Sequence, residues 1–134
     1  MDAAQALADL TEISSQIEAA VLFDDEGVVV GSTLASDEAA QAVAEAASRL
    51  LEGAAEFRTD GAVTQLEAAT SDGSVFVVRS SGRRIAATTG PAPTVGLVFY
   101  DLKSCLRNAD AEPEKPKRAR RKKTDEEKPA DDEA

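Results

Sequence analysis

The sequence predicts an α/β (α+β) domain with the element order α-β-β-α-β-β-β-α. Three observations predict this fold class. Stretches with apolar residues at helical spacing alternate with short β-branched runs, the segments between them have turn composition, and 134 residues are enough for one domain of ordinary size. We expect the domain to occupy residues 1–110 and a charged tail to occupy residues 111–134.

Three helices are predicted, and each begins after a residue whose side chain can cap it: Asp2, Ser36 and Thr94. The second helix should run to about Gly53 or Phe57, with acidic residues in its first turn. The apolar residues of the first helix are Leu7, Leu10, Ile13 and Ile17. Those of the third are Val95, Val98, Phe99, Leu102 and Leu106.

Five strands are predicted, and the first two form a hairpin. The runs AAVLF (19–23) and VVVGS (28–32) flank DDEG (24–27), a sequence typical of a hairpin loop. The acidic cluster Asp24, Asp25 and Glu26 is explained by this exposed turn, because a Mg²⁺ or Ca²⁺ site needs further oxygen ligands or an EF-hand spacing. The remaining strands are predicted as a meander at residues 62–69, 74–80 and 83–89.

The composition argues against catalysis. The chain has no histidine and one cysteine, so the usual general base, the triad partner and a thiolate metal site are all missing. We therefore expect no enzyme, no metal and no cofactor. The acidic N-terminus is unlike a signal peptide, and no apolar run is long enough for a bilayer, so a cytoplasmic protein is expected. Cys105 is expected to be a small buried side chain.

The net charge of −10 is carried entirely by residues 1–110, since the tail has equal numbers of acidic and basic side chains. The tail joins a basic block, KPKRARRKK (115–123), to an acidic block, DEEKPADDEA (125–134), and its composition predicts disorder. The basic block could bind nucleic acid or an anionic membrane, act as a nuclear import signal in a eukaryote, or serve as a solubilising tether. Its candidate binding residues are Lys117, Arg118, Arg120, Arg121, Lys122 and Lys123.

The ordered set of motifs resembles the roadblock / dynein light chain family, of the bacterial small-GTPase regulator type. The resemblance covers roughly residues 3–108 and rests on VLFDDEGVVVGST, the alanine-rich DEAAQAVAEAASRLLEGA, the meander and TVGLVFYDLK. It implies a profilin- or longin-like fold, with a five-stranded antiparallel sheet that has helices on both faces. It also implies a homodimer or heterodimer through the second helix and third strand, a small Ras-like GTPase as partner, and no cofactor.

The second helix independently favours a dimer, because its apolar arc is wider than the stripe that one supporting sheet requires. Ala39, Val43, Ala46, Leu50 and Ala54 form one stripe, and Ala40, Ala47 and Leu51 form a small-residue flank. Alanine's high helix propensity is the simpler explanation for part of this arc. The expected interface residues are Ala40, Val43, Ala47, Leu50, Leu51 and Ala54 of the helix and Val63, Gln65 and Glu67 of the next strand.

Other surface residues are weaker candidates. Arg58 could act as an arginine finger, and Arg83 with Arg84 could bind an anion, although exposed arginines are commonly just solvated. A partner surface is expected at the polar edge of the second helix, which comprises Asp37, Glu38, Gln41, Glu45 and Arg49. Two functions remain open: a non-enzymatic dimeric regulator or scaffold of a small GTPase, with a possible activating role, and a dimeric adaptor that binds nucleic acid or membrane through its tail.

Overall fold

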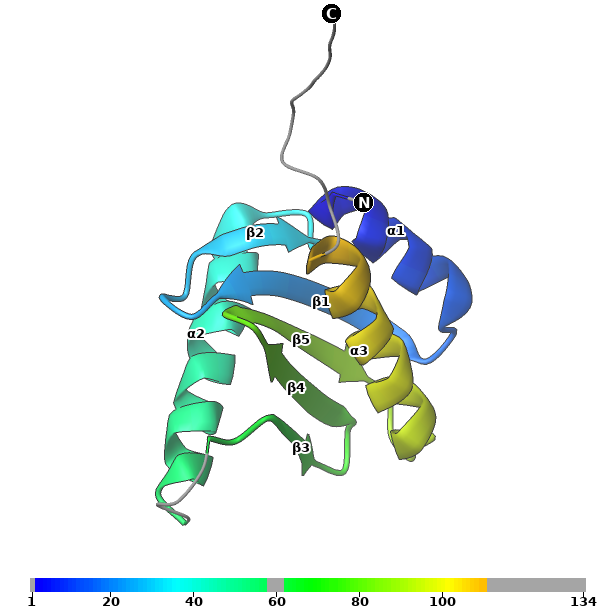
Figure 1. Cartoon of the computed structure of the whole chain (residues 1–134). Helices are drawn as coiled ribbons and strands as arrows, with labels where there is room; N and C mark the ends of the chain where they lie inside the picture. Colours follow the sequence, from blue (N-terminus) through cyan, green and yellow to red (C-terminus); the bar gives the residue numbers. More distant parts are fainter. Residues whose placement is uncertain (1, 58–61, 111–134) are drawn as a thin grey trace, which may run out of the picture.

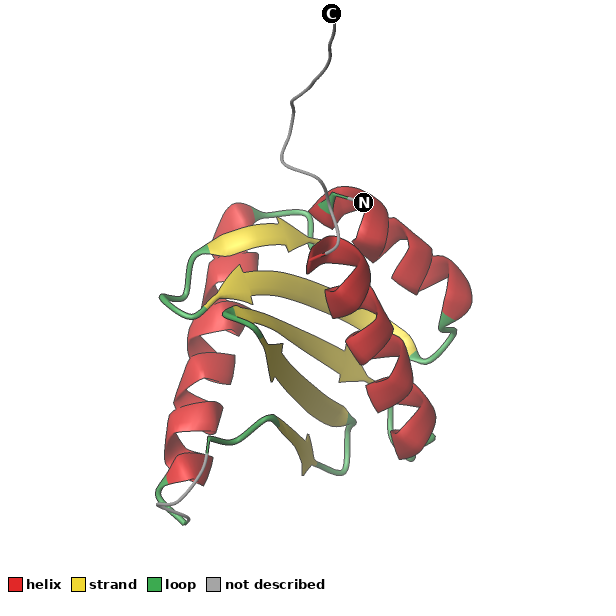
Figure 2. Cartoon of the chain, in the orientation of Figure 1, coloured by secondary structure: helices red, strands yellow, loops and turns green. Residues whose placement is uncertain are grey.

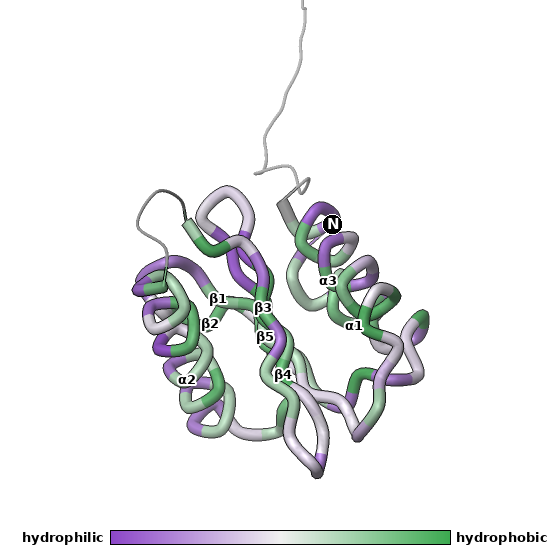
Figure 3. The backbone as a smooth tube through the Cα atoms, turned by 90° about the horizontal axis from the view of Figure 1, so that it is seen from below, coloured by the Kyte–Doolittle hydropathy of each residue, from purple (hydrophilic) through white to green (hydrophobic). Residues whose placement is uncertain are grey.

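The protein is a three-layer α+β sandwich. The computed structural model describes residues 2–57 and 62–110; Arg58 and the tail, for which a finger role and disorder were predicted, lie outside these ranges. One helix covers one face of a five-stranded sheet and two helices cover the other (Figure 1; Figure 3). Within the described residues, no helix is both long and apolar enough to span a bilayer.

The order of elements is the predicted one (Figure 2). The helices are α1 (Ala3–Ile13), α2 (Asp37–Ala55) and α3 (Val95–Asp110), and the strands are β1 (Ile17–Asp24), β2 (Val29–Ser32), β3 (Gln65–Ala69), β4 (Ser74–Ser80) and β5 (Arg83–Thr89). The strand order is β2-β1-β5-β4-β3, and every neighbouring pair is antiparallel. The strands β2 and β3 are therefore the two edges of the sheet.

Local signals in the sequence produce the helix starts and the first turn as predicted. Asp2 caps α1 by accepting a 2.8 Å hydrogen bond from the Gln5 amide, and Ser36 caps α2 by accepting one of 2.9 Å from Ala39. In the β1–β2 turn, the Asp24 carboxylate accepts the amides of Glu26 and Val28, each at 2.9 Å. The acidic turn is thus stabilised by its own backbone.

The first helix is shorter than its apolar spacing predicts. It ends at Ile13, and Ser14 adopts an extended conformation while its amide still binds the Leu10 carbonyl. Ile17 consequently starts β1, where it is buried, and Ile13 is left 72% exposed. A β-branched residue fits both patterns, and pairing of Ile17 with Thr89 of β5 decides between them.

Two separate apolar clusters hold the layers together. On one face, α1 and α3 pack on the sheet around Leu22, Phe76 and Ile85, and Phe76 meets Phe99 edge-on with ring centroids 5.0 Å apart. On the other face, α2 packs on Val21, Phe23 and Val77, among others. The inner strands β1, β4 and β5 are therefore buried on both faces, which explains their continuous apolar runs.

Cys105 is buried between α1 and α3, as predicted. Burial, with a smaller contribution from the charge of Asp9, raises the pKa of its thiol from 9.0 to about 11. Because the thiolate is the reactive form, the folded protein holds this cysteine unreactive at neutral pH.

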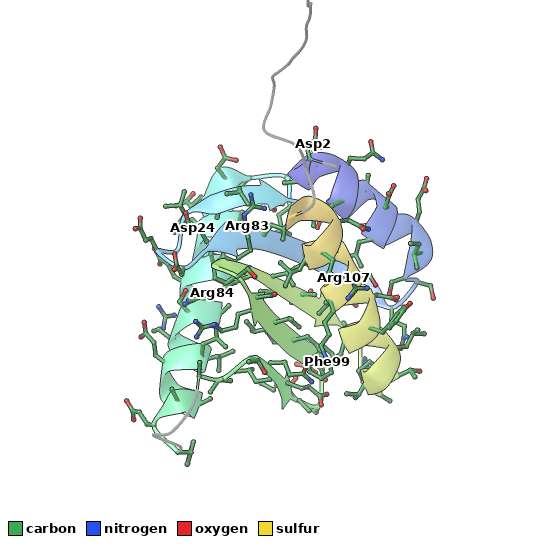
Figure 4. The ribbon with its side chains drawn as sticks, in the orientation of Figure 1. Asp2, Asp24, Arg83, Arg84, Phe99 and Arg107 are labelled. Carbon is green, nitrogen blue, oxygen red and sulfur yellow. The ribbon has the colours of Figure 1, made fainter. Side chains whose placement is uncertain are left out.

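Three arginines gather at the β4–β5 turn, two of them directly opposite each other. Arg79 pairs with Arg84 across the ladder, and strand alternation places both on the α2 face. The Arg84 Nε and the Arg83 Nη1 are buried and have no hydrogen-bond partner among the described residues. Figure 4 shows Arg83 and Arg84 near this turn. Both arginines are half-buried, so they differ from the fully solvated pair that their position at a turn predicts.

We expect the substitution Gly73→Ala to destabilise the fold. A Cβ at this position would lie 2.1 Å from the Thr89 carbonyl oxygen, so the turn before β4 would have to move away from the end of β5. Such overpacking costs roughly 1–3 kcal/mol. Urea unfolding at fixed protein concentration measures the loss. Gly96→Ala in α3 is the control, because its Cβ would meet nothing within 4 Å; equal stabilities for the two variants would contradict the prediction.

We expect the substitution Arg84→Met to leave the free energy of unfolding unchanged or to raise it by up to about 1 kcal/mol. The change removes a buried donor without a partner and the like-charge contact with Arg79, while it retains much of the side-chain volume. Urea unfolding is again the measurement, with the exposed Arg49→Met as matched control. A loss larger than about 1 kcal/mol would show that the Arg84 guanidinium has a favourable partner in solution.

Candidate interaction surface

The face of α2 that packs on the sheet is made of small residues. Its buried side chains are Ala40, Ala44, Ala47 and Leu51, which follow helical spacing. Three of these, Ala40, Ala47 and Leu51, were expected at a dimer interface. The structure corrects that expectation, because the chain's own sheet already covers their side chains. Ala44 was not among the expected residues, although its spacing from Ala40 places it on the same face.

The exposed apolar side of α2 is the other stripe. We call Ala39, Val43, Ala46, Leu50 and Ala54 the apolar flank. Leu50 is 37% exposed, and Val43 and Ala54 are half-buried. Phe57 follows the helix at the same angular position and is 87% exposed. It was not among the predicted interface residues, although a large aromatic side chain just after an apolar helix is a signal that was available.

The open edge of β3 lies at the same end of the molecule as the C-terminus of α2. Figure 1 shows α2 crossing the sheet from the β2 edge towards the β3 edge. Within the described residues, β3 is hydrogen-bonded along its length only to β4, so its other side presents backbone groups without a strand partner. Of the interface residues expected here, Gln65 and Glu67 are exposed, and Val63 is half-buried against the α2 cluster.

The opposite side of α2 is polar. We call Asp37, Glu38, Gln41, Glu45 and Arg49, the residues expected to bind a partner, the charged flank. Four of them are exposed, while the half-buried Gln41 donates a 3.1 Å hydrogen bond to the Gly27 carbonyl in the β1–β2 turn. Leu50 is nine positions from Gln41, which places the two on opposite sides of the helix. The helix therefore presents one apolar and one charged surface, separated by the face that packs on the sheet.

The acidic residues near α2 are, by residue type, potential metal ligands. The described residues contain no group of three or more histidine, cysteine or acidic side chains placed to hold a metal ion. Gln41 contacts the β1–β2 turn, and in that turn the Asp24 carboxylate accepts hydrogen bonds from backbone amides.

Comparison with known proteins gives matches of structure only. No family model and no curated protein sequence matches the chain. A Roadblock/LC7 domain from Streptomyces avermitilis superposes with a TM-score of 0.72 and 21% identity, over 82% of this chain and 96% of that domain. The gliding protein MglB of Thermus thermophilus superposes with a TM-score of 0.60 and 16% identity, over 82% of this chain and 90% of MglB.

The similarity extends to profilins. LokiProfilin1, solved in complex with rabbit actin, matches with a TM-score of 0.55 and 11% identity, over 79% of this chain and 93% of the profilin. At such identities the matches establish the fold. The chain's own five-stranded antiparallel sheet between helix layers is the arrangement that the sequence resemblance implies. The chain therefore has the fold of the Roadblock/LC7 domains and of MglB.

Proposed function

We propose that the protein is a dimeric, non-catalytic regulator or scaffold of a small Ras-like GTPase. The observation that carries the proposal is the apolar flank of α2 beside an open β3 edge, in a roadblock fold. The partner class comes from the family that the sequence resembles. The absence of histidine, together with surfaces suited to docking, supports regulation by binding.

Two copies joined at this end would cover both exposed features at once. Antiparallel pairing of two β3 edges would extend the sheet and satisfy the unpaired backbone groups. The apolar flanks would then bury Leu50 and Phe57, the large side chains that solvent now reaches. A related roadblock chain could supply the second half, so the same surface serves a homodimer or a heterodimer.

The charged flank is the surface that we assign to the GTPase. It faces away from the apolar flank, so dimerisation would leave it accessible on both copies. Four of the five residues are exposed on one rigid helix whose start is fixed by the Ser36 cap. A regulator of this kind acts by ordering the GTPase's own catalytic groups, unless a cation such as Arg58 is supplied in trans.

We expect Leu50→Glu to disrupt the dimer. A buried carboxylate at the centre of an apolar interface lacks a partner, and such substitutions cost about 2 kcal/mol or more, which is roughly a thirtyfold weaker association. Light scattering at micromolar concentration reports the mass. Leu97→Glu in α3 is the matched control, since Leu97 is 50% exposed on the other helix layer. Dissociation by both variants, or by neither, would contradict the assigned surface.

The GTPase assignment is tested by affinity capture from the native host with a GTP analogue or GDP, followed by reconstitution with the purified GTPase. We expect Glu45→Lys on the charged flank to weaken binding at least tenfold, by about 1.4 kcal/mol, and Glu12→Lys on α1 to leave it unchanged. Failure to bind any small GTPase in either nucleotide state would overturn the proposal.

Loss of all partners on replacing the six basic tail residues with glutamine would instead favour the nucleic-acid or membrane adaptor.

A further inference from the structure

A groove of about 350 Å³ opens between α3, the start of β3 and the end of β4. It lies on the side of the sheet that α1 and α3 cover, near the β4–β5 turn. Its lining residues are Thr64, Gln65, Val78, Arg79, Ser80, Lys103, Leu106 and Arg107. Val78 and Leu106 belong to the α1–α3 core cluster and form its floor, and polar side chains surround them.

The groove is the basic part of an acidic domain. Three of the six basic residues in the described ranges line it, and none of its eight described lining residues is acidic. Strand alternation directs Arg79 towards the α2 face, so the charge available in the groove comes from Lys103 and Arg107. Both are exposed and lie one turn apart on α3. Arg107, labelled on α3 in Figure 4, donates a 3.1 Å hydrogen bond to the neutral Ser104 Oγ.

We propose that this groove binds the acidic C-terminal block of the same chain, residues 125–134. The block carries six carboxylates and one lysine, so its charge complements the groove. The chain also has the required reach. Arg107 lies within one turn of Asp110, where α3 ends, and the fifteen residues from Asp110 to Asp125 can span up to about 50 Å.

Tethering makes a weak contact sufficient. Pairs between exposed charges are individually weak, but the covalent connection raises the effective concentration of the acidic block at the groove. The basic block 115–123 can pair with the carboxylates of residues 125–134, and it can also pair with the acidic surface of the domain. Docking of residues 125–134 in the groove is compatible with the second pairing, because it brings the basic block close to the acidic domain. The contact is independent of the GTPase proposal and should be sensitive to salt.

The test is paramagnetic relaxation in the full-length protein with a nitroxide on Ala130→Cys. The buried Cys105 thiol, whose pKa is raised to about 11, should stay unlabelled at neutral pH, and the wild-type chain checks this. We expect the amide signals of Gln65, Ser80, Lys103 and Arg107 to lose intensity at low salt. We expect Lys103→Glu to restore at least half of that intensity and 0.5 M salt to restore most of it.

Arg49→Glu is the matched control, because it makes the same charge change on an exposed helix of the opposite layer. Equal recovery with Arg49→Glu and Lys103→Glu would show diffuse attraction and overturn the proposal. Broadening that is absent from the groove would also overturn it. The acidic block could also dock on a second copy of the chain. A mixture of spin-labelled chains and isotope-labelled, spin-free chains tests this case, and broadening that occurs only between chains would overturn the assignment to the same chain.

Discussion

The structure depends on one constraint, which is that a single sheet must be buried on both faces by unequal helix layers. The central strands β1 and β5 send apolar side chains into both clusters. Two helices cover one face, but α2 alone covers the other (Figure 3). The helix α2 runs across the strands from the β2 edge towards the β3 edge, so its width of about 10 Å covers only part of the length of each strand (Figure 1). The open edge of β3 is a separate feature, because among the described residues this strand has a hydrogen-bonded neighbour on one side only.

Small side chains make the α2 layer possible. Ala40, Ala44 and Ala47 are almost fully buried, so the helix backbone approaches the sheet closely there, and Leu51 adds one larger buried side chain towards the end of the helix. Leu50 lies on the neighbouring apolar flank and is 37% exposed. The apolar flank of α2 is thus the surface that the proposed dimer would use.

The sequence predicts features whose causes are local, and it fails where distant residues decide. The caps at Asp2 and Ser36 and the turn at Asp24 depend on hydrogen bonds within four residues, so their residue types suffice. Ala40 was predicted at a dimer interface, but it faces the sheet. Alanine and leucine occur on both apolar stripes of α2, so periodicity alone does not show which stripe packs on the sheet. The groove could not be predicted either, since Gln65 and Lys103 meet only after the sheet and α3 have packed.

Gln65 connects the two proposals. It is the first residue of the exposed β3 edge and also part of the groove wall, whereas Lys103 and Arg107 belong to α3. Pairing of two β3 strands would fix the backbone of this wall and would place two grooves near the dimer axis, on the same side of an extended sheet. The cations that attract the tail do not depend on that pairing. The dimer would therefore make the groove more rigid without being needed for its charge, and a basic groove can persist in a domain that is otherwise strongly acidic.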